Sequence, residues 1–298
     1  MSNKIIRTNF FETICDLAKK QDQQALSKII DISACVDVAQ GPYSCVMWLA
    51  KNGQHDAVKF LLERFYANSN DATQGYATGG YIEQVNTLIV KGADRDAAVR
   101  GYAAANLIVQ VDALLKQGAS QNSAVWGYAF GHHIDQVNAF IKKAADPIFA
   151  IWGYALEGRV NEVNNLLIKG VNQDIAVWAY ALGNHTAQVD HLLNHGASIN
   201  EAVSGYARGG FIDQVNDLLN RGADVDFAVS GYATGGHIEQ VNQLLQQGAS
   251  IEFVVKSYAL GGHVNQVNQL LQQGASKEAA IQGYKNGGYL DLINQIAE

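Results

Sequence analysis

Apolar residues recur at helical spacing through most of this chain. In the stretch IEQVNQLLQQG at residues 238–248, Ile238, Val241 and Leu244 fall on one face of a helix, and the glutamines between them fall on the other. This pattern predicts an amphipathic helix. The same spacing returns at residues 82–89 and 212–219.

The helix belongs to a repeat with a constant period. Alignment on a recurring tyrosine gives a step of 26 residues without insertion or deletion. The tyrosines are Tyr76, Tyr102, Tyr128, Tyr154, Tyr180, Tyr206, Tyr232, Tyr258 and Tyr284. Eight full units span residues 75–282, and a truncated ninth ends at residue 298. Each unit therefore holds a first helix around the tyrosine and a second, amphipathic helix.

Residue types at its two ends define the first helix, as in PIFAIWGYALEG at residues 147–158. It is preceded in every unit by a residue that can cap a helix N-terminus. These residues are Asp94, Ser120, Asp146, Asn172, Ser198, Asp224, Ser250 and Ser276. The turn that follows the helix holds Gly, Asn or His at its second position, which predicts a left-handed conformation there. These turn residues are Gly80, Asn106, His132, Gly158, Asn184, Gly210, Gly236, Gly262 and Gly288.

The stretch KNGQHDAVKFLLERFYAN at residues 51–68 resembles the second helix of an ankyrin repeat, and GGHIEQVNQLLQQGAS resembles the same element. Residues 10–31 resemble a further, degenerate unit. The resemblance implies an all-α, right-handed solenoid of stacked helix-turn-helix repeats. The units are shorter than ankyrin repeats, so we expect the β-hairpin fingers to be missing from about residue 68 onward. We divide the chain into an ankyrin-type segment at residues 1–74 and an array with a capping repeat at residues 75–298.

Stacking explains the repetition, because a single helix pair cannot bury its apolar face alone. With layers about 10 Å apart, some ten layers predict a curved rod about 100 Å long. We expect such a rod to offer extended surface and no deep pocket.

Charge and cysteine content narrow the class of partner. Residues 1–72 carry eight basic and eight acidic side chains, so the remaining residues carry the whole net charge of −7. An acidic array repels phosphate backbones, which argues against nucleic acid. Cys15, Cys35 and Cys45 lack metal-ligand spacing and indicate a reducing compartment. We expect neither a secretory signal nor membrane insertion, and we predict a cytoplasmic protein.

The most informative position is the sixth of the first helix. Three successive units place Trp126, Trp152 and Trp178 there, whereas other units place Arg100, Ser204, Ser230, Lys256 or Gln282. Four residues later, on the same helix face, the three units carry Phe130, Leu156 and Leu182, and Ile148 extends the stripe. Two interpretations stay open: an exposed contact patch for a protein or peptide, or tryptophans that stack to stiffen the array.

Residues that appear in every unit suggest structural roles. Each tyrosine is followed ten residues later by Asn or Asp, which predicts hydrogen bonds between the two, from Tyr76 and Asn86 to Tyr284 and Asn294. Gln or Glu at the third position of the second helix predicts capping, as at Gln84 and Glu162. The remaining such residues are Gln110, Gln136, Gln188, Gln214, Gln240 and Gln266.

Histidine does not predict a metal site in this chain. His133, His185, His237 and His263 recur one per unit at the turn, where ankyrin repeats carry a structural histidine. His191 and His195 share a helix face but lack a third ligand. We expect no metal and no cofactor.

These observations favour a non-catalytic module or scaffold that binds a protein through the first helices of the central repeats. One alternative is an enzyme or enzyme subunit whose site in the N-terminal segment uses Cys45 and His55. Another is a secreted bacterial effector that acts in the host cytosol by binding host proteins, since long ankyrin-like arrays are common in bacteria living inside eukaryotic cells. Neither the partner nor the oligomeric state follows from the sequence.

Overall fold

The computed structural model describes residues 16–17, 19–21, 39–40, 43–65, 67–289, 292–293 and 296. Cys15, Cys35, Asn294 and most of the degenerate unit at residues 10–31 lie outside these residues. A two-residue hairpin, β1 (Ala39–Gln40) with β2 (Tyr43–Ser44), precedes the helices. No strand follows Ser44 in the described residues, as expected for an array without fingers.

The helices alternate between two rows, as the repeat predicts. The first helices are α4 (Cys45–Lys51), α6 (Ser69–Gly79), α8 (Arg95–Ala104), α10 (Gln121–Phe130), α12 (Ile148–Leu156), α14 (Gln173–Leu182), α16 (Ile199–Arg208), α18 (Val225–Thr234), α20 (Ile251–Leu260) and α22 (Lys277–Gly287). The second helices are α5 (His55–Phe65), α7 (Ile82–Val90), α9 (Ile108–Lys116), α11 (Ile134–Lys142), α13 (Val160–Leu167), α15 (Thr186–Asn194), α17 (Ile212–Asn220), α19 (Ile238–Gln246) and α21 (Val264–Gln272). The protein is an all-α solenoid.

The predicted helix ends are present. The N-cap side chain accepts a hydrogen bond from its own helix in α8, α10, α14, α16, α18 and α22, and Asp146 does the same ahead of α12. Ser250 is the exception and makes no such bond. All nine turn residues have positive φ, between 57° and 79°. Glycine is suited to these turns because it adopts positive φ without steric cost.

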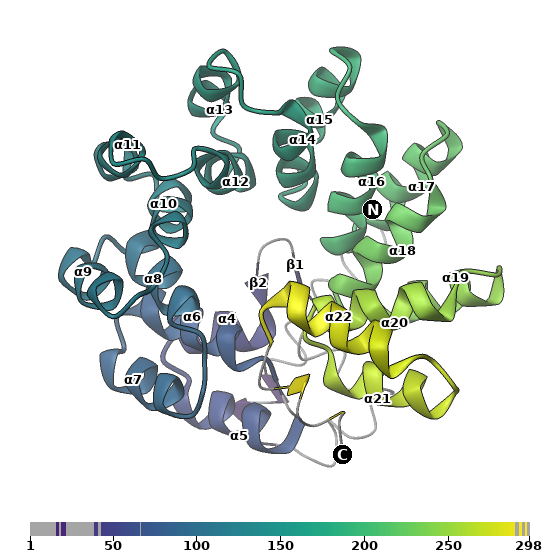
Figure 1. Cartoon of the computed structure of the whole chain (residues 1–298), viewed down its shortest axis with the longest axis horizontal. Helices are drawn as coiled ribbons and strands as arrows, with labels where there is room; N and C mark the ends of the chain where they lie inside the picture. The colour runs from purple at the N-terminus through teal and green to yellow at the C-terminus, as the bar shows by residue number, and fades with distance from the viewer. Residues whose placement is uncertain are drawn as a thin grey trace.

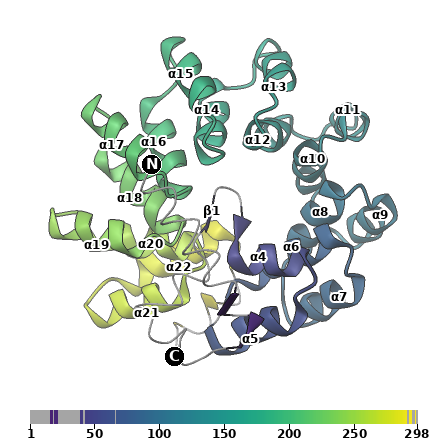
Figure 2. The same ribbon diagram turned by 180° about the vertical axis from the view of Figure 1, so that it is seen from behind.

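The solenoid is curled far more strongly than a rod. Figures 1 and 2 show one nearly closed turn, with first helices lining the inside and second helices the outside. The two ends of the array meet, since Asn68 Nδ2, just ahead of α6, donates to the Tyr289 hydroxyl oxygen, just after α22, at 3.1 Å. The expectation of a curved rod about 100 Å long is therefore wrong. We use the name lumen for the space enclosed by the first helices.

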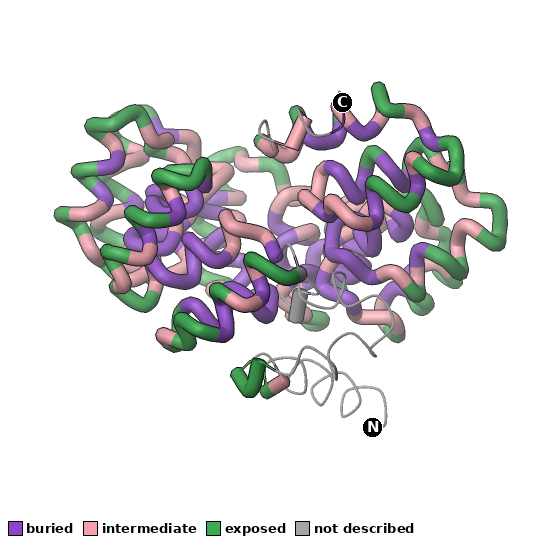
Figure 3. Tube along the Cα trace, turned by 90° about the horizontal axis from the view of Figure 1, so that it is seen from below, coloured by how far each residue is buried: buried purple, intermediate pink, exposed green. Residues whose placement is uncertain are grey.

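The seventh residue of the first helix explains the curvature. A Cβ atom placed on Gly153 would lie 2.5 Å from the Trp126 carbonyl oxygen of the layer before it. Six other units carry glycine there with an equally close backbone, so first helices approach almost to contact. Neighbouring second helices remain further apart. Each unit is thus a wedge, and the wedges add up to a ring whose buried residues follow the inner helices (Figure 3).

Two boundaries between layers are looser than the rest. Ala179 replaces glycine between α12 and α14, and Ser257 replaces it between α18 and α20. The first helices at these two boundaries pack against each other less extensively than at the others. The extra side-chain atoms separate the layers, in agreement with the close approach that glycine permits elsewhere.

Candidate protein-binding surface

The three tryptophans lie in adjacent layers on the inside of the ring. Trp126 is on α10, Trp152 on α12 and Trp178 on α14, and each is partly exposed. Trp126 stacks on Phe130 with ring centroids 5.1 Å apart and ring planes 8° apart. The stacking fixes the indole against the helix that carries it, so the ring is held in one orientation.

The other two tryptophans contact each other across layers. Their ring centroids are 6.1 Å apart, and the planes are tilted by 43°. Phe149 packs on Trp152 at 5.3 Å from the preceding turn of α12. The contact between Trp152 and Trp178 bridges the loose boundary between α12 and α14. Trp152 and Trp178 therefore pack between layers, and all three tryptophans keep part of their surface accessible. That they contact a protein or peptide stays a prediction.

Two residues expected in the exposed stripe are buried. Leu156 is 6% exposed and Leu182 is 7% exposed. Both leucines belong to the cluster of buried residues that forms the hydrophobic core. The accessible stripe consists of Trp126, Phe130, Ile148, Trp152 and Trp178, all of which keep part of their surface. We call these five residues the aromatic stripe.

Ile148 interrupts a hydrogen-bond ladder that sequence reasoning missed. At the second position of the first helix, the eight other units carry Asn, Asp or Glu. In six of them the side chain accepts a bond from the backbone N–H at the start of the next first helix. The acceptors and donors are Asn70 and Asp94, Asp96 and Ser120, Asn122 and Asp146, Asp174 and Ser198, Asn200 and Asp224, and Glu252 and Ser276, at 2.7 to 3.1 Å. An isoleucine cannot accept this bond. Ile148 therefore lacks the hydrogen bond between layers and instead adds apolar surface beside Trp152.

The recurrent histidines have the structural role expected of them. His133, His185, His237 and His263 place Nε2 within 3.1 Å of a backbone carbonyl oxygen in the unit before, to which the ring N–H donates. No group of three potential metal ligands occurs among the described residues. His195 Nδ1 lies 2.7 Å from the carbonyl oxygen of His191, so the His195 ring bonds to the backbone at the end of α15.

Two other expectations are not met at most units. Within the described residues, six of the recurrent tyrosines, from Tyr76 to Tyr206, make no hydrogen bond to the Asn or Asp ten residues later, and six of the glutamines, from Gln84 to Gln240, make no side-chain bond to the start of their helix. The Tyr180 hydroxyl is buried without a hydrogen-bond partner, while Asp190, ten residues later, accepts from Arg221 at 3.4 Å. Glu162 pairs with His132 of the previous turn at 3.0 Å, rather than capping its own helix through its side chain. The bond to His132 is the main cause that lowers the pKa of Glu162. Asp190 and Glu162 thus find partners in neighbouring layers, which the sequence of one unit does not show.

The arrangement of Cys45 and His55 does not support a nucleophilic site. Cys45 is fully buried in α4. His55 is exposed at the start of α5, where its ring packs against Tyr76 at 5.4 Å and Tyr81 at 5.0 Å. A nucleophile needs a base within hydrogen-bond reach and an opening for substrate. A thiol buried in the core offers no opening for substrate.

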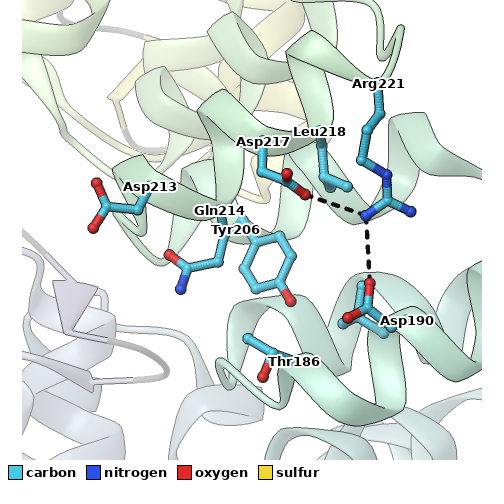
Figure 4. Close-up of a pocket in the computed structure, with 9 residues that line it drawn as sticks. Thr186, Asp190, Tyr206, Asp213, Gln214, Asp217, Leu218 and Arg221 are labelled. Carbon is cyan, nitrogen blue, oxygen red and sulfur yellow. Dashed lines mark hydrogen bonds and ion pairs between the residues drawn. The ribbon is translucent and has the colours of Figure 1, made fainter.

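Shallow grooves open on the outside of the ring, between second helices. The groove between α15 and α17 has a volume of about 220 Å³. Figure 4 shows Tyr206 at its base, with its hydroxyl directed toward α15, and Arg221 bridging Asp190 and Asp217. Both carboxylates are well exposed, and exposed ion pairs contribute little to stability or recognition. A similar groove lies one layer earlier. Grooves of this kind follow from the wedge shape of the units.

The chain was compared with models of protein families and with curated proteins, and nothing matches in either comparison. Within the part of the chain that the structure describes, no helix has the length and apolar character to cross a bilayer. The aromatic stripe lies on the inner helices α10, α12 and α14.

Proposed function

We propose that this protein is a non-catalytic binding module that engages a protein partner with the inner face of its central repeats. The contact surface is the aromatic stripe. A single observation carries the proposal: three adjacent layers place partly exposed tryptophans where other layers place polar or charged side chains. Tryptophan is strongly enriched among residues that dominate binding energy at protein interfaces.

The departure at Ile148 supports the same conclusion. A bond between layers of the kind that is absent there contributes about 1 kcal/mol. A partly exposed isoleucine beside a partly exposed tryptophan does not recover this energy in the free protein, but it adds apolar contact area in a complex. The resemblance to ankyrin repeats agrees with a role in protein binding. Because the array lacks β-hairpin fingers, the helix faces must make the contacts with a partner. We place this activity in the cytosol, including a host cytosol if the protein is a secreted effector.

The experiment is affinity capture by the full chain, with chemical cross-linking and identification of the captured proteins. The test variant changes Trp126, Trp152 and Trp178 to serine. A matched control changes three outer apolar residues, Val90, Val109 and Ile168, which are 88%, 75% and 84% exposed, to serine. We expect the test variant to lose specific partners and the control to keep them. Undiminished capture by a folded test variant would refute the assignment of the surface.

A further inference from the structure

The groove between α13 and α15, on the outside of the ring, is lined by a tyrosine whose hydroxyl group has no partner. The groove has a volume of about 220 Å³. Tyr180 is 2% exposed, and its hydroxyl group makes no hydrogen bond within the described residues. Three other buried side-chain atoms in the described part of the chain lack a partner, on Arg159, Asn184 and His263, but none of these residues lines either groove. A buried hydroxyl without a partner costs free energy, so this position indicates a use for the group.

The lining of this groove combines apolar walls with neutral polar groups. The apolar residues are Val160 on α13 and Ala187 and Leu192 on α15. Besides Tyr180, the polar residues are Asn164, Gln188 and His191. Among the described residues, the side chains of these three make no hydrogen bond, and no Asp, Glu, Lys or Arg lines the groove. The rim is therefore free to adjust to a ligand, and the lining carries no carboxylate, ammonium or guanidinium group.

The neighbouring groove between α15 and α17 has the same position occupied differently. The equivalent tyrosine there is Tyr206, and its hydroxyl group is not among the buried atoms that lack a partner. Arg221 pairs with Asp190 and Asp217 in this groove (Figure 4). The two grooves thus have similar volumes and different charge. The groove at Tyr206 can serve as a matched control for the groove at Tyr180.

The charge of the surroundings favours a neutral ligand. The carboxylate whose charge acts on Tyr180 is Glu162, which is already paired with His132 at 3.0 Å. An ammonium group would therefore lose hydration without gaining a free carboxylate. A carboxylate ligand meets a chain with a net charge of −7. Burial raises the pKa of the Tyr180 hydroxyl, and the charge of Glu162 adds to this rise, so the group stays protonated and can donate a hydrogen bond.

The volume of the groove indicates the size of the ligand. About 220 Å³ corresponds to roughly seven water-sized groups, which is about the size of a phenol. Most pockets for whole metabolites are larger. A phenol group also has the apolar body that the walls require and a hydroxyl group that both donates and accepts.

We propose that this groove binds a phenol group, supplied by a free phenol or by a tyrosine side chain of a partner protein. The phenol lies between Val160 and Leu192, and its hydroxyl group forms a hydrogen bond with Tyr180 at the base. Gln188 and His191 move aside as the phenol enters. The site is on the outer helices and is independent of the aromatic stripe.

The test is an NMR titration of the isotope-labelled full-length protein with p-cresol, followed through backbone amide signals. We expect saturable shifts at Ala187, Gln188 and Leu192. Toluene lacks the hydroxyl group, and 4-methylbenzylamine and 4-methylbenzoate carry a charge in its place. We expect p-cresol to bind about fivefold more tightly than each of the three, the factor that one hydrogen bond supplies. A parallel titration with N-acetyltyrosine methylamide identifies the source: tighter binding than p-cresol indicates a protein side chain, and weaker binding indicates a free phenol.

Three variants, each verified as folded by circular dichroism, separate the hydroxyl group from the rest of the groove. Tyr180→Phe should lower the affinity for p-cresol to that for toluene. The same change should raise the melting temperature, because it removes a buried hydroxyl without a partner. Tyr206→Phe, the matched control, should leave the affinity for p-cresol unchanged. Ala187→Leu narrows the groove and should weaken binding of both p-cresol and toluene at least tenfold.

Several results would overturn this assignment. They are shifts that do not cluster at the groove, equal affinity for p-cresol and toluene, a preference for a charged analogue, and unchanged p-cresol binding in Tyr180→Phe. A lower melting temperature of Tyr180→Phe would also count against it, because the hydroxyl group would then have a partner in the free protein. Failure of the proposed function is a separate result, since the variant with all three tryptophans changed to serine should still bind p-cresol.

Discussion

At the scale of single residues, glycine at the seventh position of the first helix determines how closely two layers approach. The role differs from that of glycine in the turns. A Cβ on Gly153 collides with backbone atoms of α10, whereas a Cβ on Gly248, whose φ is +100°, meets nothing within 4 Å. The same substitution therefore tests packing at one site and backbone conformation at the other.

We expect Gly153→Ala to destabilise the protein by about 2–3 kcal/mol, because α12 must move away from α10. Gly248→Ala should cost about 1 kcal/mol, the penalty for a left-handed residue with a side chain. Thermal melts followed by circular dichroism would measure both. Equal effects of the two changes would contradict the interpretation that backbone contact requires Gly153.

Protonation of His263 is a second property of a single residue. Burial lowers the pKa of His263 to about 4 from an ordinary value of 6.5, its bond to the Thr234 carbonyl oxygen raises it, and the charge of Arg208 lowers it. The unfolded chain thus binds this proton more readily than the folded one. Neutral His263 therefore does not reduce the free energy of unfolding above about pH 6.5. As the pH falls from 6.5 toward 4, the unfolded chain takes up this proton and the free energy of unfolding falls.

Wild type should therefore lose about 2–3 kcal/mol at pH 4.5 through this group alone. In His263→Gln, an amide can still donate to Thr234 but carries no titrating proton, so the decline between pH 7 and 4.5 should be smaller by that amount. Denaturant titrations at both pH values provide the measurement, with His185→Gln as control. An identical decline in wild type and His263→Gln would exclude His263 as its source.

At the scale of helices, the ladder between successive first helices explains why one unit departs from the others. Eight of nine units carry Asn, Asp or Glu at the second position, and only Ile148 differs. The bond is also absent at the other loose boundary, between α18 and α20. Asp226 carries a suitable carboxylate there, but the Ser250 N–H does not donate to it within the described residues. The two loose boundaries thus lack both the glycine and the ladder bond.

Restoring the ladder should separate stability from binding. Ile148→Asn supplies an acceptor for the Asn172 N–H and is expected to stabilise the protein by about 1 kcal/mol. The same change removes apolar surface beside Trp152 and should weaken partner capture. Asn200→Ile, the reciprocal control, breaks the bond to the Asp224 N–H at 2.8 Å and should destabilise without affecting capture. A rise in capture with Ile148→Asn would contradict the role given to the aromatic stripe.

Sequence periodicity predicted the helices, their caps and the left-handed turns, because these depend on contacts within one unit. The ladder had a visible signal, a carboxylate or amide in almost every unit, but its partner lies 24 residues away in the next layer. Burial of Leu156 and Leu182 also depends on how layers overlap. Residues that meet across the ring, such as Asn68 and Tyr289, have no local pattern to reveal them.

At the scale of the whole molecule, curvature converts a linear array into a ring with an inside. A small difference in spacing between inner and outer helices accumulates over all layers, so the sequence of one unit cannot give the final shape. Curvature is also what brings Asn68 within 3.1 Å of the Tyr289 hydroxyl oxygen, although 221 residues separate the two. The shape of the molecule in solution therefore bears directly on this contact.

Small-angle X-ray scattering distinguishes the ring from the rod. A compact chain of this length has a radius of gyration of about 19 Å, whereas a rod about 100 Å long gives about 30 Å. We expect a value close to the compact one.

The Tyr289 side chain should contribute to the closure of the ring. Tyr289→Ala removes the phenol group that packs over Gly262 and accepts a hydrogen bond from Asn68, so this change should open the ring and raise the radius of gyration. Tyr289→Phe keeps the packing and loses only the hydrogen bond, so its effect should be smaller. A rod-like radius in wild type would contradict the closed ring and its contact between Asn68 and Tyr289.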